Sequence, residues 1–118
     1  MKVYIIGSMR NKKIVDVDNA LSEAGFEAFS EWAAPGPEAD DYWQIYSRNK
    51  GQDFRTASQS PHAKNVFDFD YRHLMEADAV VVVMPAGKSA FSEMCWFGGY
   101  YRGERRCFVL LDGEPDRF

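Results

Sequence analysis

Residues 66–100 read VFDFDYRHLMEADAVVVVMPAGKSAFSEMCWFGGY, and this stretch decides the fold. Its centre, residues 79–84, is an unbroken apolar run rich in valine, which is typical of a parallel strand buried on both faces. A turn with proline and glycine follows, and the apolar pattern after it predicts a helix over 90–102. Glu93 lies in the first turn of that predicted helix, and Asp70 precedes the strand. The stretch therefore predicts two carboxylates delivered to one crevice.

The residues upstream of this stretch show a strand, helix, strand pattern. Residues 2–6 are an apolar strand, apolar residues at helical spacing over 14–24 predict a helix that Gly25 ends, and residues 26–29 form a short strand. Such units give parallel strands with right-handed crossovers. With a last strand at 107–111, the sequence predicts the α/β class: an open parallel sheet of four or five strands with helices on both faces, in one domain over 1–118.

The composition is that of an ordinary globular protein, with 118 residues, 46% hydrophobic and 27% charged. A formal charge of −4 excludes the basic footprint expected for nucleic acid or an anionic membrane. The longest apolar run is too short to span a bilayer, and the start MKVYIIGSMR lacks the features of a signal peptide. We therefore expect a cytoplasmic protein with no nucleic-acid or membrane partner.

The two cysteines, Cys95 and Cys107, lie in apolar segments without CxxC spacing or a nearby pair of histidines. Free thiols in such segments are typically buried. We expect two buried free cysteines and no metal site.

The turn after the first strand contains Gly7, Ser8 and Arg10. In open parallel sheets, ligands bind beyond the carboxyl ends of the strands, and this turn lies at that edge. Backbone N–H groups, a hydroxyl and a guanidinium at a helix start suit a phosphate, although an ordinary strand–helix turn explains the same residues. Gly87 and Ser89 begin the helix that follows the central strand, where Ser89 is expected to be an N-cap and can also face a sugar or phosphate.

Asp70 and Glu93 each have a structural explanation. Asp70 fits a helix N-cap, and a glutamate in a first helical turn is favoured by the helix dipole. Glu93 is also the only acid in a strongly apolar helix, where burial opposes its ionisation while the helix N-terminus should keep it ionised. As a pair, the two fit bond cleavage at an anomeric carbon, in which one acid attacks the carbon and the other handles the proton of the leaving group.

The connection 30–61 is long, rich in aromatic residues, and predicted to contain a helix over 38–49. Connections of this length are typically lids or binding loops. Trp32, Trp43 and Tyr46 could stack on a base, or they could pack beneath the loop.

Taken together, these residues resemble the nucleoside 2-deoxyribosyltransferase superfamily, including its 2′-deoxynucleoside 5′-phosphate N-hydrolase branch. The resemblance rests on the turn IIGSMRN (5–11), on Asp70 followed by Ala-Asp (77–78) and the valine strand, and on GKSAFSEMCWFGGY (87–100). In the last segment, Glu93 occupies the place of the family's nucleophilic glutamate.

This resemblance implies a flavodoxin-like sheet, a homodimer with composite sites, and cleavage of the N-glycosidic bond of a nucleoside or its 5′-monophosphate. Glu93 would form a glycosyl-enzyme, while Asp70 would assist departure of the base and then activate water or a second base. Ser8, Arg10 and Ser89 would hold the 5′ group, and no metal or organic cofactor is implied. Arg10 favours a monophosphate, because a free nucleoside needs no cation at its 5′ end.

Two other classes of protein fit parts of the sequence. One is a non-catalytic nucleotide-binding module with the same fold. The other is an interaction protein that uses the helix predicted over 90–102, which is apolar nearly all round. Because such a helix is buried on more than one side, we also expect it to contact another subunit of a homodimer or larger homo-oligomer.

Overall fold

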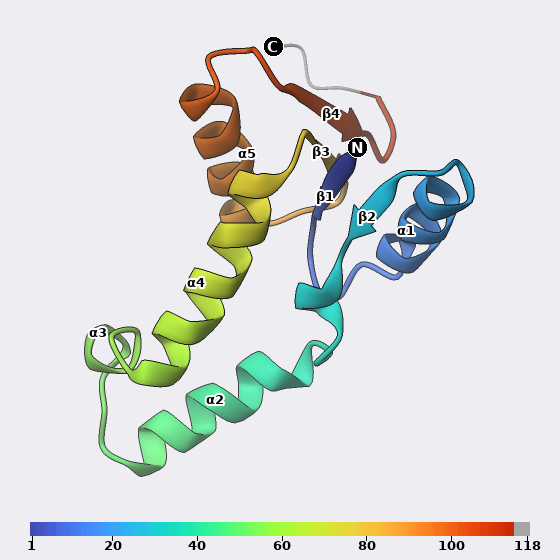
Figure 1. Cartoon of the computed structure of the whole chain (residues 1–118). Coiled ribbons are helices and arrows are strands. Elements are labelled where there is room, and N and C mark those ends of the chain that lie inside the picture. Colours follow the sequence, from blue (N-terminus) through green and yellow to red (C-terminus); the bar gives the residue numbers. More distant parts are fainter. Residues whose placement is uncertain (115–118) are drawn as a thin grey trace.

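The computed structural model describes residues 1–114, except for the side chain of Asp40, and its core is a four-stranded parallel sheet in the order β2–β1–β3–β4 (Figure 1). The strands are β1 (Lys2–Ile6), β2 (Glu27–Phe29), β3 (Ala79–Val83) and β4 (Arg106–Leu110). The helices are α1 (Lys13–Glu23), the short 3₁₀ helix η1 (Glu31–Ala33), α2 (Glu38–Asn49), α3 (Phe54–Ala57), α4 (Pro61–Glu76) and α5 (Lys88–Tyr100). This is the predicted open α/β sheet, of the flavodoxin-like type.

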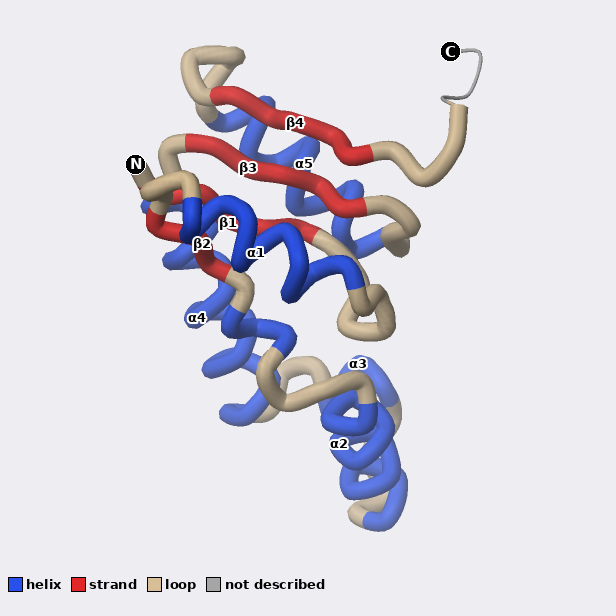
Figure 2. The backbone as a smooth tube through the Cα atoms, turned by 90° about the vertical axis from the view of Figure 1, so that its right-hand side faces the viewer, coloured by secondary structure: helices blue, strands red, loops and turns tan. Residues whose placement is uncertain are grey.

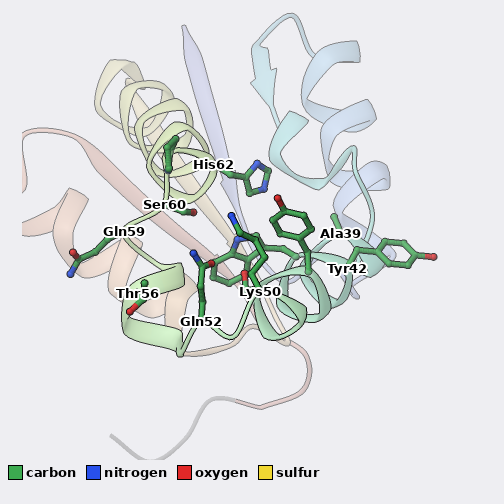
Figure 3. A pocket seen from close by; sticks show the side chains of 12 residues that line it. Ala39, Tyr42, Lys50, Gln52, Thr56, Gln59, Ser60 and His62 are labelled. Carbon is green, nitrogen blue, oxygen red and sulfur yellow. The ribbon is translucent and has the colours of Figure 1, made fainter.

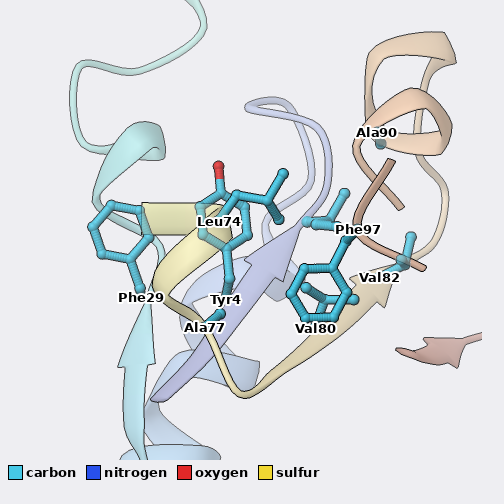
Figure 4. Packing of buried hydrophobic residues seen from close by; sticks show 9 residues of the cluster. Tyr4, Phe29, Leu74, Ala77, Val80, Val82, Ala90 and Phe97 are labelled. Atoms are coloured by element: carbon cyan, nitrogen blue, oxygen red, sulfur yellow. The ribbon is translucent and has the colours of Figure 1, made fainter. Parts of the chain in front are cut away.

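Helices cover both faces of the sheet, with α1 on one side and α4 and α5 on the other (Figure 2). Successive residues of a strand point to opposite faces, so Val80 and Val82 pack with Leu74 and Phe97 on the α4–α5 side (Figure 4). The intervening valines of β3 face α1. All five residues of β3 are buried, which explains why its sequence is apolar without alternation.

The sheet has its topological switch point between β1 and β3, which pair in parallel although a long stretch of chain separates them. Asn11, in the loop after β1, donates its side-chain amide to the carbonyl oxygens of Val83 (3.3 Å) and Pro85 (3.4 Å). A Cβ on Gly7 would lie 2.5 Å from Cδ1 of Ile14, so any larger residue there would require the Ile14 side chain to shift. The two loops that border the predicted crevice are thus held together.

Two predicted helix starts are wrong. Helix α4 begins at Pro61, where the Ser60 hydroxyl accepts the Ala63 N–H (3.3 Å), so Asp70 lies inside the helix and is not an N-cap. Nothing between 61 and 76 interrupts the helix, since it contains no further proline and no glycine.

Helix α5 begins at Lys88 with Gly87 as the N-cap, so Ser89 is inside the helix and is not its cap. The same shift places Glu93 in the second turn of α5 and not in the first. The dipole of the helix acts mainly on its first turn, so Glu93 receives less stabilisation of its anion than predicted.

Helices α2 and α3 and the first half of α4 project away from the sheet as an arm (Figure 1). The radius of gyration is 15.4 Å, whereas a compact domain of this length has a value of about 13 to 14 Å. Large apolar side chains of the arm are open to solvent, including Tyr42, which is 69% exposed, and Phe54, which is 78% exposed. The arm therefore has almost no core of its own.

Both cysteines are free, but they are exposed, so the prediction that they are buried is wrong. Cys107 is on the edge strand β4, whose five residues are all exposed, and Cys95 lies on the outer face of α5. Apolar sequence did not distinguish an edge strand from a central one. Within residues 1–114, no helix combines the length and the apolar character needed to cross a membrane.

Candidate active site

Asp70 and Glu93 come from different helices, α4 and α5, which pack against the same face of the sheet. The charge of Asp70 raises the pKa of Glu93, and the charges of both raise the pKa of Tyr4 on β1, beyond the larger effect of its burial. These effects are consistent with three side chains that lie near one another between α4, α5 and β1. The tertiary structure therefore brings the two predicted carboxylates together beside a phenol.

Burial is the main cause of the raised pKa values of both carboxyl groups, which makes them weaker acids than usual. It raises the pKa of Glu93 to about 7, with a further increase from the Asp70 charge and a decrease from the Ser89 hydroxyl, which donates to Glu93 Oε1 (3.4 Å). Burial also raises the pKa of Asp70 to about 6. Desolvation opposes the ionisation of Glu93 more than the start of α5 favours it, because the helix dipole acts mainly on the first turn. Glu93 is therefore only partly ionised near neutral pH, and less so than predicted.

Tyr4 is the member of this cluster that the sequence interpretation missed. Its side chain is only 1% exposed, and Figure 4 shows its hydroxyl pointing away from the strand beside Leu74. The segment KVYII has the pattern of an apolar strand. The one feature that could have indicated a role for Tyr4 in the site is its hydroxyl, which is a polar group in an otherwise apolar run. A buried phenol of this kind normally needs a polar partner, and Asp70 and Glu93 are the charged groups whose electrostatic effect reaches it.

The loop after β1 brings the predicted anion-binding residues to the edge of the sheet. Ser8 Oγ accepts the backbone N–H of Arg10 (3.2 Å), which shapes the turn. The guanidinium of Arg10 is paired with Asp41 in the first turns of α2, with Nη2 and Oδ2 3.5 Å apart. Arg10 thus connects the sheet to the arm in this structure.

The three aromatic residues predicted to stack on a base occupy two different places. Trp32 is structural, since its indole N–H donates to the carbonyl oxygen of Ile5 (2.8 Å) and its ring packs against both cores. Trp43 and Tyr46 line a cavity of about 880 Å³ between α2, α3 and the start of α4. Neither Asp70 nor Glu93 lines this cavity, so the structure does not bring these aromatic rings to the carboxylates.

The two carboxyl groups are suited to act as a general acid and a general base. With pKa values near 6 and 7, the pair carries about one proton close to neutral pH, so one member is an acid while the other is an anion. In the part of the chain that the structure describes, no cluster of three His, Cys, Asp or Glu side chains is arranged to hold a metal ion.

The fold and this cluster define an α/β protein with a flavodoxin-like sheet and a carboxylate pair beside its switch point. Compared with known protein families, curated proteins and solved structures, the chain gives no significant match. The carboxylate pair and its surroundings are therefore the basis for assigning a function.

Proposed function

We propose that the protein cleaves the N-glycosidic bond of a (deoxy)nucleoside or its 5′-monophosphate and passes the sugar to water or to another base. The observation that carries the proposal is the pairing of Asp70 and Glu93, both with raised pKa values, beside the switch point of the sheet. Cleavage at an anomeric carbon with retention typically uses such a pair of carboxyl groups.

In the first step, the anion of Glu93 attacks C1′ of the sugar and forms an ester. The bond between C1′ and the base nitrogen breaks, its electron pair moves to the base, and Asp70 donates a proton to the leaving base. The reactive form thus has its proton on Asp70 and its negative charge on Glu93. The hydroxyl of Ser89 favours this arrangement because it lowers the pKa of Glu93. Burial and the Asp70 charge nevertheless keep that pKa above the pKa of Asp70, so the reactive form is the minor one of the two forms that carry a single proton.

In the second step, Asp70 takes a proton from water or from an acceptor base, which then attacks C1′ and releases the carboxylate of Glu93. The 5′ group of the sugar would be held by Gly7, Ser8 and Arg10, and a phosphate would replace Asp41 as the partner of Arg10. Gly87 and Ser89 border the other side of the site.

We also propose that the protein is a homodimer through α5 and the neighbouring face of α4. Trp96 is 53% exposed, its ring centroid lies 6.3 Å from that of Tyr71, and Tyr71 stacks on Phe67 at 5.7 Å. These three rings form one exposed aromatic patch across two helices. Patches of this kind mark protein interfaces.

The experiment is chromatography of the protein after incubation with ribo- and deoxynucleosides and their 5′-monophosphates, each with and without a second free base. Release of a base defines a hydrolase, whereas exchange that needs the second base defines a transferase. Glu93→Gln should lower the rate at least about 1,000-fold, and Asp70→Asn about 100-fold. Asp68→Asn, which changes an exposed acid on the same helix, is the matched control.

Substrate binding by Glu93→Gln should remain close to that of wild type, because the variant changes the reacting oxygen and little else. Absence of product from every substrate, together with binding of one of them, would overturn the catalytic proposal and leave a nucleotide-binding module. Activity that survives in Glu93→Gln would remove Glu93 from the mechanism.

A further inference from the structure

The cavity between α2, α3 and the start of α4 is separate from the carboxylate pair. Its volume of about 880 Å³ is large enough for a small organic ligand. His62 at its rim and Asp70 are eight residues apart on α4, which corresponds to about 12 Å along a helix. Figure 3 shows the His62 ring directed from α4 toward the side on which α2 lies.

One wall of the cavity is aromatic. Tyr42 and Trp43 are adjacent on α2, and Tyr46 lies about one turn further along. Trp43 is held by edge-on contact with Phe54, with ring centroids 6.5 Å apart. Flat rings on a surface of this kind offer a stacking platform for another ring. Lys50, on the same wall, has its ammonium group 5.4 Å from the centre of the Tyr46 ring.

The opposite wall is polar and contains no acid. Gln52, Thr56, Gln59 and Ser60 supply amide and hydroxyl groups, and Lys50 and His62 are the basic residues of the lining. Among the described side chains that line the cavity, none is Asp or Glu, although the chain has a net charge of −4. The N-terminus of α4, which is the positive end of its helix dipole, also lies at this wall, because α4 starts at Pro61.

We propose that this cavity is a second ligand site that binds an aromatic anion, a planar ring carrying a phosphate or a carboxylate. The ring stacks on the face formed by Trp43 and Tyr46. The anionic group pairs with Lys50 and with His62 at the start of α4, and the glutamine amides bond to the edge of the ring. An acid-free, lysine-containing cavity with an aromatic wall selects against cations and against purely aliphatic ligands.

The test is titration of the full ¹⁵N-labelled chain followed by NMR, with calorimetry for affinity. The probes are a purine nucleoside 5′-monophosphate, the corresponding nucleoside, benzoate and inorganic phosphate. Nucleotides and nucleosides are added to Glu93→Gln so that turnover cannot consume them. The probes that carry both a ring and an anionic group should bind best and should shift the signals of the Trp43 indole and of His62. Comparison of the nucleotide, which carries a phosphate, with benzoate, which carries a carboxylate, identifies the preferred type of anion.

The variants distinguish this cavity from the carboxylate site. Lys50→Gln should weaken binding about tenfold, because a bond to a charged group is lost, and Tyr46→Ala should weaken it about as much. Tyr46 is largely exposed, so its removal leaves the core intact. Lys64→Gln, an exposed lysine on α4 outside the cavity, and Arg10→Gln should leave these shifts unchanged.

The proposal is overturned if none of the probes shifts the cavity signals at millimolar concentration, or if Arg10→Gln abolishes the shifts and Lys50→Gln does not. It is also overturned if the same signals shift with protein concentration alone, because a second copy of the chain would then fill the cavity. Binding is measured in the absence of turnover, so a failure of the proposed enzymatic activity leaves this test unaffected.

Discussion

The sheet and the arm of this protein are built in opposite ways. In the sheet, all five residues of β3 are buried, and the helices α4 and α5 that carry Asp70 and Glu93 pack on its face. In the arm, Tyr42, Tyr46 and Phe54 are exposed, and among its described side chains only Ser47 and Ala57 are buried.

This difference assigns two tasks to different regions, with the raised pKa values of the carboxylates in the sheet region and a binding surface in the arm. Raised pKa values need desolvation and fixed neighbours, which only a packed region provides, and both carboxylates lie there. A surface of exposed rings on a weakly packed arm is suited to binding, because its side chains can adjust to what they contact. The ion pair between Arg10 and Asp41 joins the two regions.

The largest expected effect is on stability. Phe97→Ala, in the fully buried core beneath α5, should lower the free energy of unfolding by about 3 to 5 kcal/mol. Phe54→Ala, in the arm, should lower it by less than about 1 kcal/mol. Urea denaturation measures both. Equal losses would mean that the arm is packed as tightly as the sheet, which would contradict the contrast between the two regions.

The next effect is the pH dependence of stability. The pKa of Glu93 is raised to about 7 in the folded state, so the folded state binds the proton more tightly than the unfolded state does. The resulting contribution of Glu93 to the free energy of unfolding is fully present below the unfolded pKa near 4.5 and is lost as the pH rises through 7. Between pH 5 and pH 8 this loss amounts to about 2 to 3 kcal/mol. Asp70, with a pKa raised to about 6, acts in the same direction.

Glu93→Gln should therefore gain stability relative to wild type as the pH rises from 5 to 8, as measured by urea denaturation at each pH. Glu23→Gln, an exposed acid on α1, is the control and should follow wild type. Parallel curves for wild type and Glu93→Gln would show that Glu93 is not desolvated.

A third effect concerns self-association. Trp96→Glu places a charge in the exposed aromatic patch of α4 and α5 and should weaken the proposed dimer at least about 30-fold. Val15→Glu, on the exposed face of α1 across the sheet, should leave it unchanged. Analytical ultracentrifugation over a range of concentrations measures both variants. A wild-type chain that stays monomeric throughout would contradict the dimer.

The smallest effect tests the connection between the two regions. Asp41→Asn frees Arg10 and should tighten the binding of a 5′-monophosphate about two- to fivefold, because an exposed ion pair contributes only about 0 to 1 kcal/mol. Affinity for the unphosphorylated nucleoside should not change. Glu38→Gln, which removes an acid at the start of the same helix, is the control. Equal gains from both variants would indicate general electrostatics and not competition for Arg10.

Much of the fold could be predicted because local patterns are strong here. The valine run of β3, the strand of residues 2–6 and the helix over 38–49 all lie where their patterns indicated. Helix starts were less predictable. Asp70 and Ser89 both have side chains that cap helices well, but Ser60 and Gly87 begin the helices instead, because each precedes an uninterrupted helical segment.

The sequence by itself determined the class of fold, the parallel sheet and the two acids that stand out from apolar surroundings, because periodicity and residue type report directly on burial along a strand or helix. Only the tertiary structure decided that Tyr4 joins those acids, that Cys95 and Cys107 are exposed, and that Trp43 and Tyr46 line a cavity of their own. These features depend on which segments pack together across the chain, and a local pattern carries no information about its distant neighbours.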